Sequence, residues 1–125
     1  MCATASAEPW ELKIPERLEI VAGQSGTLPI AIAVDRGRTI SKDAALILDL
    51  ASDGGVTVKK KRLGRGDAVD PDADAPRFAV ALHGEAVGEF TLRVHLRFWL
   101  CGGRVCRPVD ARRTVAVAVQ GTPAP

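Results

Sequence analysis

The chain is poor in aromatic residues, which make up 4% of its 125 residues and include no tyrosine. So few rings offer little surface on which nucleic-acid bases could stack. The formal net charge of +2 is also too small for an extended phosphate-binding surface. No apolar run approaches the roughly eighteen residues that a transmembrane helix requires. The sequence therefore predicts no nucleic-acid partner and no membrane-spanning helix.

Helical periodicity is missing too, because no stretch of about a dozen residues repeats its apolar positions at three-and-four spacing. Motifs of hydrolases, nucleotide-binding sites and phosphate-binding loops are absent. His83 and His95 have no spacing typical of a zinc site. Asp70, Asp72 and Asp74 are spaced like the start of a calcium loop, but the glycine and the distal glutamate of such a loop are missing. We therefore expect no cofactor and no metal.

Two further charged stretches are predicted to be solvated surface. Residues 59–62 form a basic run, Lys-Lys-Lys-Arg, of the kind found at the end of a strand. Residues 65–67 match a cell-adhesion tripeptide, but a match of only three residues often occurs by chance. We assign a function to neither stretch.

What the chain does contain is alternation of apolar and polar side chains with a period of two. This pattern is typical of strands that bury one face against a core. The alternating runs lie within residues 10–20, 28–34, 46–50, 56–58, 78–82, 90–100 and 105–119. Turn signals separate them, and Pro15 interrupts the first run, as expected of an edge strand. We predict an all-β fold, an immunoglobulin-like antiparallel β-sandwich of about seven to eight strands.

The length of the chain is that of one domain, which buries about two thirds of the surface of its unfolded form. Residues 1–9 are interpreted as a flexible N-terminal tether, residues 10–120 as the β-sandwich and residues 121–125 as a C-terminal tail. Residues 35–43 are polar and contain a glycine, so we expect a loop there.

Cys101 and Cys106 flank a Gly-Gly pair between the last two alternating runs. This arrangement predicts a β-hairpin whose tip is closed, or can be closed, by a Cys101–Cys106 bridge. So small a ring gains only about 2 kcal/mol from loop closure, and a bridge between distant strands would gain more. That difference favours a reactive role, whereas the frequency of stapling disulfides in exported domains favours a structural one.

Charged residues near the two cysteines bear on the same question. Arg97, Arg104 and Arg107 surround them in sequence, and nearby cations favour thiolate over thiol. The period of two places Trp99 and Arg97 on the same strand face as Cys101. A thiolate is both a better nucleophile and a better leaving group in disulfide exchange. The residues alone leave a structural and a redox-active pair as open alternatives.

The segments Phe98-Trp99-Leu100-Cys101 and Cys106-Arg107-Pro108, followed by a basic, valine-rich final strand, resemble a known family. They are similar to the N-terminal periplasmic domains of thiol:disulfide interchange proteins of the DsbD type. Related β-sandwich domains occur in bacterial thioredoxin-like and NHL-repeat proteins, and residues 37–45 are similar to the segment before a central strand of such domains.

The resemblance implies an immunoglobulin-like fold and an envelope thiol–disulfide exchange domain. Cys101 and Cys106 would pass electrons to or from a thioredoxin-like protein or a fused redox domain, with the three arginines and Trp99 tuning them. The family has an aromatic residue where this chain has Arg107, and it has a longer cysteine spacing. The alternative is therefore a non-catalytic β-sandwich interaction module whose cysteine pair is a structural disulfide.

A third cysteine, Cys2, precedes the small residues 3–7. Two interpretations imply export: Cys2 is the lipid-modified first residue of a lipoprotein, or Ala5-Ser6-Ala7 is the small-x-small end of a signal peptide. An ordinary flexible N-terminus is the third. We expect a periplasmic or cell-envelope location, with membrane contact only through a lipid anchor at Cys2.

Overall fold

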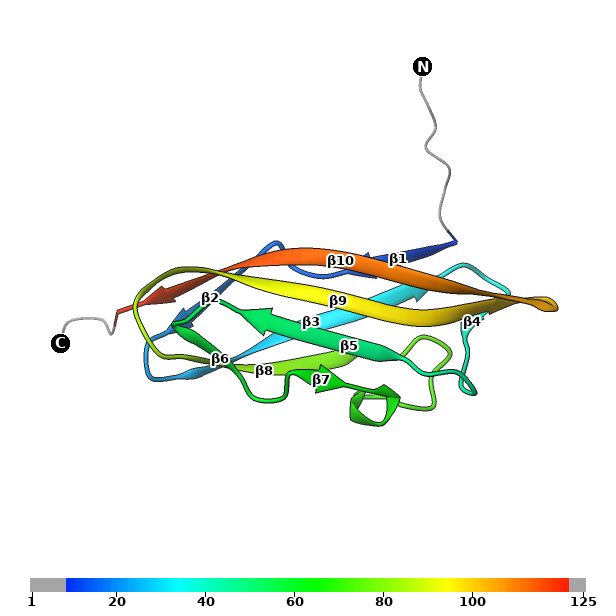
Figure 1. Ribbon diagram of the computed structural model, residues 1–125, viewed down its shortest axis with the longest axis horizontal. Coiled ribbons are helices and arrows are strands. Elements are labelled where there is room, and N and C mark those ends of the chain that lie inside the picture. Colours follow the sequence, from blue (N-terminus) through cyan, green and yellow to red (C-terminus); the bar gives the residue numbers. More distant parts are fainter. Residues whose placement is uncertain (1–8, 122–125) are drawn as a thin grey trace, which may run out of the picture.

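The computed structural model describes residues 9–121, which are built almost entirely of β-strands (Figure 1). The strands are β1 (Trp10–Lys13), β2 (Arg17–Val21), β3 (Ser25–Val34), β4 (Arg38–Ile40), β5 (Ile47–Ser52), β6 (Val56–Val58), β7 (Arg62–Leu63), β8 (Phe78–Gly84), β9 (Gly88–Gly102) and β10 (Val105–Gln120). One 3-10 turn, η1 (Arg65–Asp67), lies between β7 and β8. Within residues 9–121 no helix is long and apolar enough to cross a membrane. The predicted all-β fold is confirmed.

The strands form two sheets that pack face to face. One sheet has the order β1-β3-β8-β6, and the other has the order β2-β10-β9-β5-β7, with β4 pairing on β9 (Figure 1). The chain changes sheets at Pro15, because β1 pairs with β3 whereas β2 pairs parallel with β10. Proline lacks the N–H that a continuous ladder needs, so a break at this position is expected.

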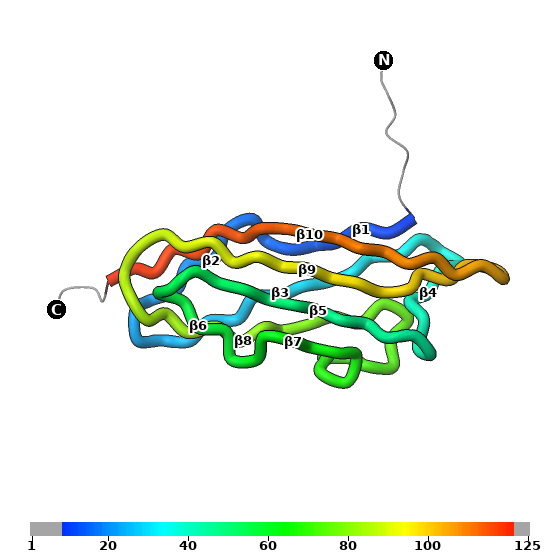
Figure 2. Tube along the Cα trace, in the orientation of Figure 1, coloured from blue at the N-terminus to red at the C-terminus, as the bar shows by residue number. Residues whose placement is uncertain are grey.

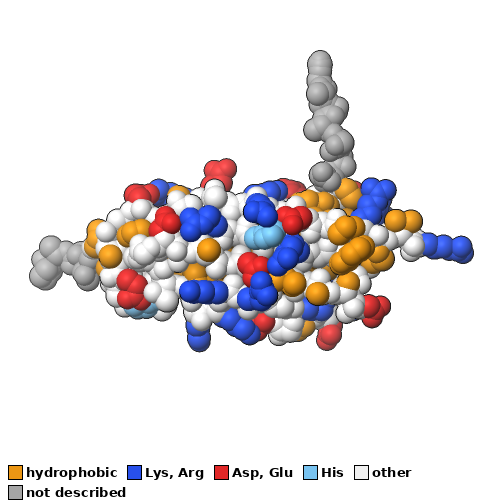
Figure 3. Space-filling view, viewed as in Figure 1, with side chains coloured by type: hydrophobic (Ala, Val, Ile, Leu, Met, Phe, Trp, Pro, Cys, Tyr) orange, Lys and Arg blue, Asp and Glu red, His pale blue; other side chains and the backbone are white. Residues whose placement is uncertain are grey.

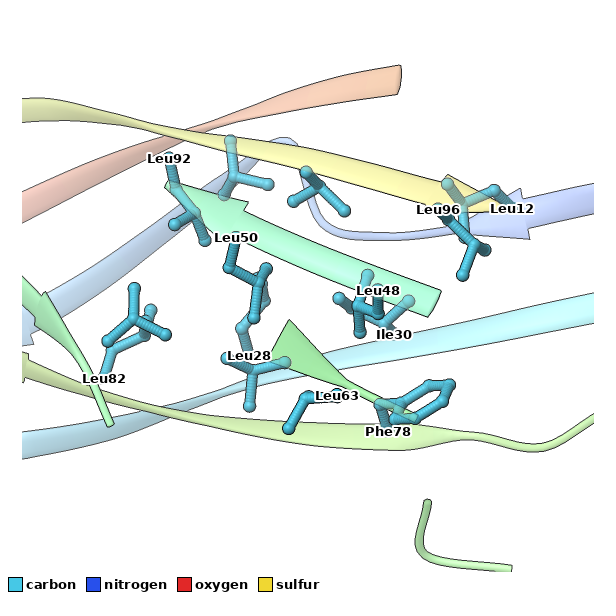
Figure 4. Close-up of a cluster of buried hydrophobic side chains, with 14 of the residues drawn as sticks. Leu12, Leu28, Ile30, Leu48, Leu50, Leu63, Phe78, Leu82, Leu92 and Leu96 are labelled. Carbon is cyan, nitrogen blue, oxygen red and sulfur yellow. The ribbon is translucent and has the colours of Figure 1, made fainter. Parts of the chain in front are cut away.

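The core lies between the inner faces of the two sheets. Most apolar positions of the alternating runs are buried, as Leu92, Leu96 and Phe98 of β9 illustrate. Figure 4 shows the leucines of β9 and β5 pointing toward those of β3 and β8. The Trp10 ring closes one margin of this core edge-on against Phe98, with centroids 5.9 Å apart.

The number of strands exceeds the seven to eight expected, since the structure has ten. Two of the additional strands are short: β4 falls inside the segment 35–43 that was predicted to be a loop, and β7 begins at the last residue of the basic run. The loop prediction was wrong for Arg38–Ile40, where Ile40 is fully buried and Arg38 pairs with Gly102. Arg38–Ile40 has only one apolar residue and therefore shows no alternation, unlike the equally short Val56–Val58.

The β9–β10 hairpin is the longest feature of the molecule. Its register runs from the Gly88–Val119 pair to the Gly102–Val105 pair. Figure 2 shows that the hairpin tip projects beyond the other strands at one end of the sandwich. Gly103 turns the chain with φ of +61°, a left-handed conformation that glycine adopts without strain. The predicted hairpin is therefore confirmed.

Candidate functional site

The hairpin tip carries a disulfide between Cys101 and Cys106. The two residues are directly opposite each other in the β9–β10 register, with their Cα atoms 4.0 Å apart and their sulfurs bonded at 2.02 Å. Cys106 is exposed, whereas Cys101 is half-buried because Thr39 of β4 lies beside it on the other side. The predicted pairing is confirmed, and neither cysteine lies deep between the sheets.

Apolar side chains surround the bridge. Trp99 is opposite Pro108 in the next register pair on the same sheet face, and its side chain is 42% exposed. Val105, at the turn, is 58% exposed. By the alternation of β10, Val105 lies on the opposite face, with Arg107, so we call Trp99, Cys101, Cys106 and Pro108 the tip patch. Figure 3 shows hydrophobic side chains gathered at this end of the molecule, with basic side chains at its extremity.

The arginines predicted to tune the sulfurs do not all face them. Arg97 lies on the same sheet face as Cys101, but its Nη2 donates a 2.9 Å hydrogen bond to Asp49 Oδ2. Arg107 is opposite the buried Leu100, so the alternation of β10 turns its side chain to the other face. Arg104 is exposed in the turn. Sequence proximity thus brings Arg97 and Trp99, but not Arg107, to the face of the sulfurs.

A further arginine reaches the tip from β4. An ideal Cβ on Gly102 would lie 2.5 Å from Cδ of Arg38, so the Arg38 side chain lies directly over the Gly102 backbone. Sequence reasoning missed Arg38 because β4 itself was not predicted. The one available signal was the order polar, polar, apolar in Arg38-Thr39-Ile40.

The segment beside Cys101 is held in place by Arg65. One guanidinium nitrogen, Nη1, donates to the carbonyls of Pro71 (2.8 Å) and Ala73 (3.1 Å). The other, Nη2, donates to the carbonyls of Ile40 (2.8 Å) and Ser41 (3.3 Å). Arg65 is half-buried. One side chain therefore ties the loop of residues 70–74, which we call the acidic loop, to the end of β4.

The aspartates of the acidic loop and of the adhesion-like tripeptide form hydrogen bonds within the protein. Asp67 accepts hydrogen bonds from Lys60 Nζ (2.6 Å) and from the Gly64 amide (2.9 Å). Asp70 accepts from the Arg77 amide at 2.7 Å, which is the largest cause of its lowered pKa. Asp74 instead accepts from Thr39 Oγ1 at 3.3 Å. Within residues 9–121 no three His, Cys, Asp or Glu side chains gather as a metal site would require.

On the exposed face of the larger sheet, Asp49 pairs with two arginines. Its carboxylate accepts hydrogen bonds from Arg62 Nε (2.7 Å) and Arg97 Nη2 (2.9 Å). The hydrogen bond from Arg62 is the largest cause of the lowered pKa of Asp49, and Arg97 adds to the effect. Beside it, the hydrogen bond from His95 lowers the pKa of Asp110.

We expect the free energy of unfolding to fall as the pH is lowered below about 4, the ordinary pKa of an aspartate. A carboxyl whose pKa is lowered by folding stabilises the fold above its unfolded pKa, and this contribution is lost as the pH falls through the folded value. Asp49→Asn should therefore flatten the decline measured by urea denaturation from pH 5 down to about pH 2. Asp72→Asn is the control, because Asp72 has no ion pair in the described part of the chain. Equal declines for the two variants would contradict the role given to Asp49.

Two facing sheets with this strand order define the class of fold as an immunoglobulin-like β-sandwich. No family model matches the sequence, and no curated protein matches it. Among solved structures, the native form of E. coli alpha-2-macroglobulin is similar with 13% identity and a TM-score of 0.49, over 90% of this chain and 7% of that one. The BIgI domain of the S. agalactiae beta protein is similar with 10% identity and a TM-score of 0.45, over 91% and 99% of the two chains.

A third similar structure is AggA, the major subunit of an E. coli aggregative adherence fimbria. It shares 9% identity and a TM-score of 0.47, over 95% of this chain and 100% of that one. The chain spans only 7% of the macroglobulin but nearly all of the other two proteins. Identities this low concern the fold alone.

Proposed function

We propose that the protein is a non-catalytic β-sandwich interaction module whose tip patch contacts a partner protein, with Cys101–Cys106 as a structural disulfide. The observation that carries the proposal is the exposure of Trp99 on a surface fixed on both sides, by the bridge and by Pro108. Tryptophan is enriched among the residues that contribute most to binding, and a rigid surface loses little entropy when it binds.

The surroundings of the bridge support a structural role. The two cysteines are directly opposite in a ladder that continues past them to the Gly102–Val105 pair, so the strands already hold the sulfurs together. Of the three arginines near them in sequence, Arg97 is paired with Asp49 and Arg107 faces away. Arg104 in the turn and Arg38 over the Gly102 backbone remain at the tip, but fewer cations face the sulfurs than the three arginines in sequence suggest, so the thiolate that exchange requires gains less from them.

The proposed location follows from the same bond. Disulfides persist in oxidising compartments and are rare in reducing ones, so a periplasmic or cell-envelope location fits a stapled tip. Cys2, the proposed site of a lipid anchor, lies outside the described residues. An anchor there would hold the module at a membrane surface, where a protein partner could reach its tip.

A second function, thiol–disulfide exchange with a thioredoxin-like partner, is favoured by the exposure of Cys106. The DsbD-type resemblance belongs to this proposal. In the exchange, a partner thiolate would attack the Cys106 sulfur, and Cys101 would leave as a thiolate. The partner's second thiolate would then attack the partner's sulfur of the mixed disulfide, and Cys106 would leave as a thiolate. The partner would end as the disulfide and this protein as the dithiol, two electrons having moved.

One experiment distinguishes the two functions. A photo-crosslinking residue is placed at Arg104, which is exposed in the turn next to the tip patch, or, as a matched control, at Val87, which is 64% exposed elsewhere. We expect an adduct with an envelope protein from position 104 only, lost on Trp99→Ala and retained in the Cys101→Ser, Cys106→Ser double variant. The double variant should fold and be about 2 kcal/mol less stable.

The redox behaviour supplies the second readout. A structural bridge should have a midpoint potential below about −300 mV in a thiol-labelling titration. A midpoint above that value, with an adduct that needs both cysteines, would replace the interaction module by the exchange domain. Adducts of equal yield from positions 104 and 87 would contradict both functions.

A further inference from the structure

One long edge of β10 has no neighbouring strand. β2 pairs with β10 only from Ala116 to Gln120, so among the described residues nothing pairs with this side of residues 105–115. The Ala116 amide donates to the Glu16 carbonyl on this side at 2.9 Å. Since the direction of backbone groups alternates along a strand, the even-numbered residues before Ala116 also direct theirs outward. The amides of Cys106, Asp110, Arg112 and Thr114 are therefore open to another strand.

Pro108 fits the same assignment. It takes an even-numbered, outward position, and proline within sheets is confined to positions where the N–H side faces solvent. Only one outward donor is thus missing from the free edge. An open row of backbone donors and acceptors is a template for an additional strand.

Two grooves lie between this edge and β1 of the other sheet. One, of about 740 Å³, is lined near this edge by Leu12, Ile14 and Arg113, and it continues across β9 and β5 to residues 93–95 and 49–51. The other, of about 730 Å³, is lined by Trp10 and by Arg107 and Val109 of β10. Figure 1 shows β1 following β10 along this side of the molecule. A strand added to β10 would direct every second side chain toward these grooves.

The charges along the edge define what such a strand must carry. Arg107, Val109, Ala111 and Arg113 share one face of β10, with an arginine at each end and apolar residues between. Neither arginine forms an ion pair within residues 9–121; Arg113 donates instead to the Arg112 carbonyl at 2.8 Å. Opposite charges placed across neighbouring strands stabilise the pair, whereas like charges destabilise it.

We infer that the free edge of β10 receives an extended segment of a partner protein with the pattern acidic-x-apolar-x-apolar-x-acidic. Its backbone hydrogen-bonds to Asp110, Arg112 and Thr114, its acidic side chains pair with Arg107 and Arg113, and its apolar side chains enter the grooves. Because the pattern reads the same in both directions, it fits a parallel or an antiparallel strand. This surface adjoins the tip patch at Cys106 and Pro108, but Trp99 takes no part in it, and it extends the proposed role to a second contact.

A second copy of the chain fits less well. Antiparallel pairing that aligns the whole free edges, residue 105 with residue 115, places Arg107 opposite Arg113 of the other copy. The same register places Asp110 opposite itself. Like charges directly opposite across a strand pair are destabilising. The charge pattern therefore favours a partner of acidic character.

The test uses the full chain labelled with ¹⁵N and a blocked heptapeptide, Glu-Thr-Val-Thr-Val-Thr-Glu. We expect its addition at up to about 1 mM, a concentration suited to weak binding, to shift the amide signals of Asp110, Arg112 and Thr114. A peptide with lysine at both ends, or with N-methylated threonines, should leave them in place. The Arg107→Glu, Arg113→Glu double variant should bind the glutamate peptide about tenfold more weakly and the lysine peptide more tightly.

Three outcomes would overturn the inference. One is slow hydrogen exchange of these amides in the free chain, which would show that the edge is already covered. Another is equal binding of the glutamate and lysine peptides, or no binding of either peptide. The third is a set of shifts centred on Trp99 instead of β10. Trp99→Ala should leave peptide binding unchanged, so failure of the tip-patch function and failure of this one are distinguishable.

Discussion

Replacing Arg65 by methionine is expected to lower the free energy of unfolding by about 3 kcal/mol. Its guanidinium donates to four backbone carbonyls, two in the acidic loop and two at the end of β4. Methionine fills much of the same volume but donates no hydrogen bond, so those carbonyls lose a charged donor in a half-buried position. A polar group left unsatisfied away from water costs about 1–3 kcal/mol. Urea denaturation measures the loss.

Arg77→Met is the matched control for this change. Arg77 lies close to the same loop and pairs with Asp70 at 3.0 Å, but its side chain is 62% exposed. Exposed ion pairs contribute about 0–1 kcal/mol, so the control variant should stay within that range. Hydrogen exchange adds a local readout, because the Ile40 amide donates to the Asp74 carbonyl and should lose protection only when Arg65 is replaced. Equal losses for the two variants would show that Arg65 holds nothing beyond an ordinary surface pair.

Much of the fold was available from the sequence because the relevant signals are local. A period of two identifies each long strand from its own residues, and the Gly-Gly pair between two such runs identifies the hairpin. The bridge followed from these, since Cys101 and Cys106 sit at equal distances from the turn. The same counting also determines faces: it places Trp99 with the sulfurs and Arg107 on the opposite side.

What the sequence did not yield depends on contacts between distant segments. Arg65 binds carbonyl groups of residues 40 and 41 and of residues 71 and 73, and a backbone carbonyl has no side-chain signature. β4 is stabilised by pairing with β9 and by burial of Ile40, not by a pattern of its own. The pairing of Arg97 with Asp49 spans 48 residues. Proximity in sequence therefore included Arg97, which is paired, and missed Arg38, which lies over Gly102.

The free edge of β10 likewise combines a feature that the sequence shows with one that depends on the fold. Its charge pattern can be read along the strand, but the exposure of that pattern depends on where β2 ends. β2 begins only at Arg17 because the chain is in the other sheet until Pro15. The one proline that breaks the first alternating run thus also leaves residues 105–115 without a neighbour. A local signal and a topological consequence together create the surface.

Replacing Gly55 by alanine should cost about 3 kcal/mol or more of the free energy of unfolding. Gly55 has φ of +108°, a conformation that residues with a Cβ rarely adopt. A Cβ there would also lie 2.2 Å from Cζ of Phe90, a half-buried ring that packs against the core. Backbone strain and steric overlap are separate causes, and each contributes about 1–3 kcal/mol.

The neighbouring Gly54 supplies the control, since a Cβ built on it meets nothing within 4 Å and its φ is not positive. Gly54→Ala should change the stability by less than about 0.5 kcal/mol. Combining Gly55→Ala with Phe90→Leu separates the two causes: the smaller side chain relieves the overlap but leaves the strain, so the pair should be less destabilising than the sum of the single changes. Additive losses would mean that Phe90 moves aside at no cost, and equal stability of the two alanine variants would mean that Gly55 needs neither its conformation nor its space.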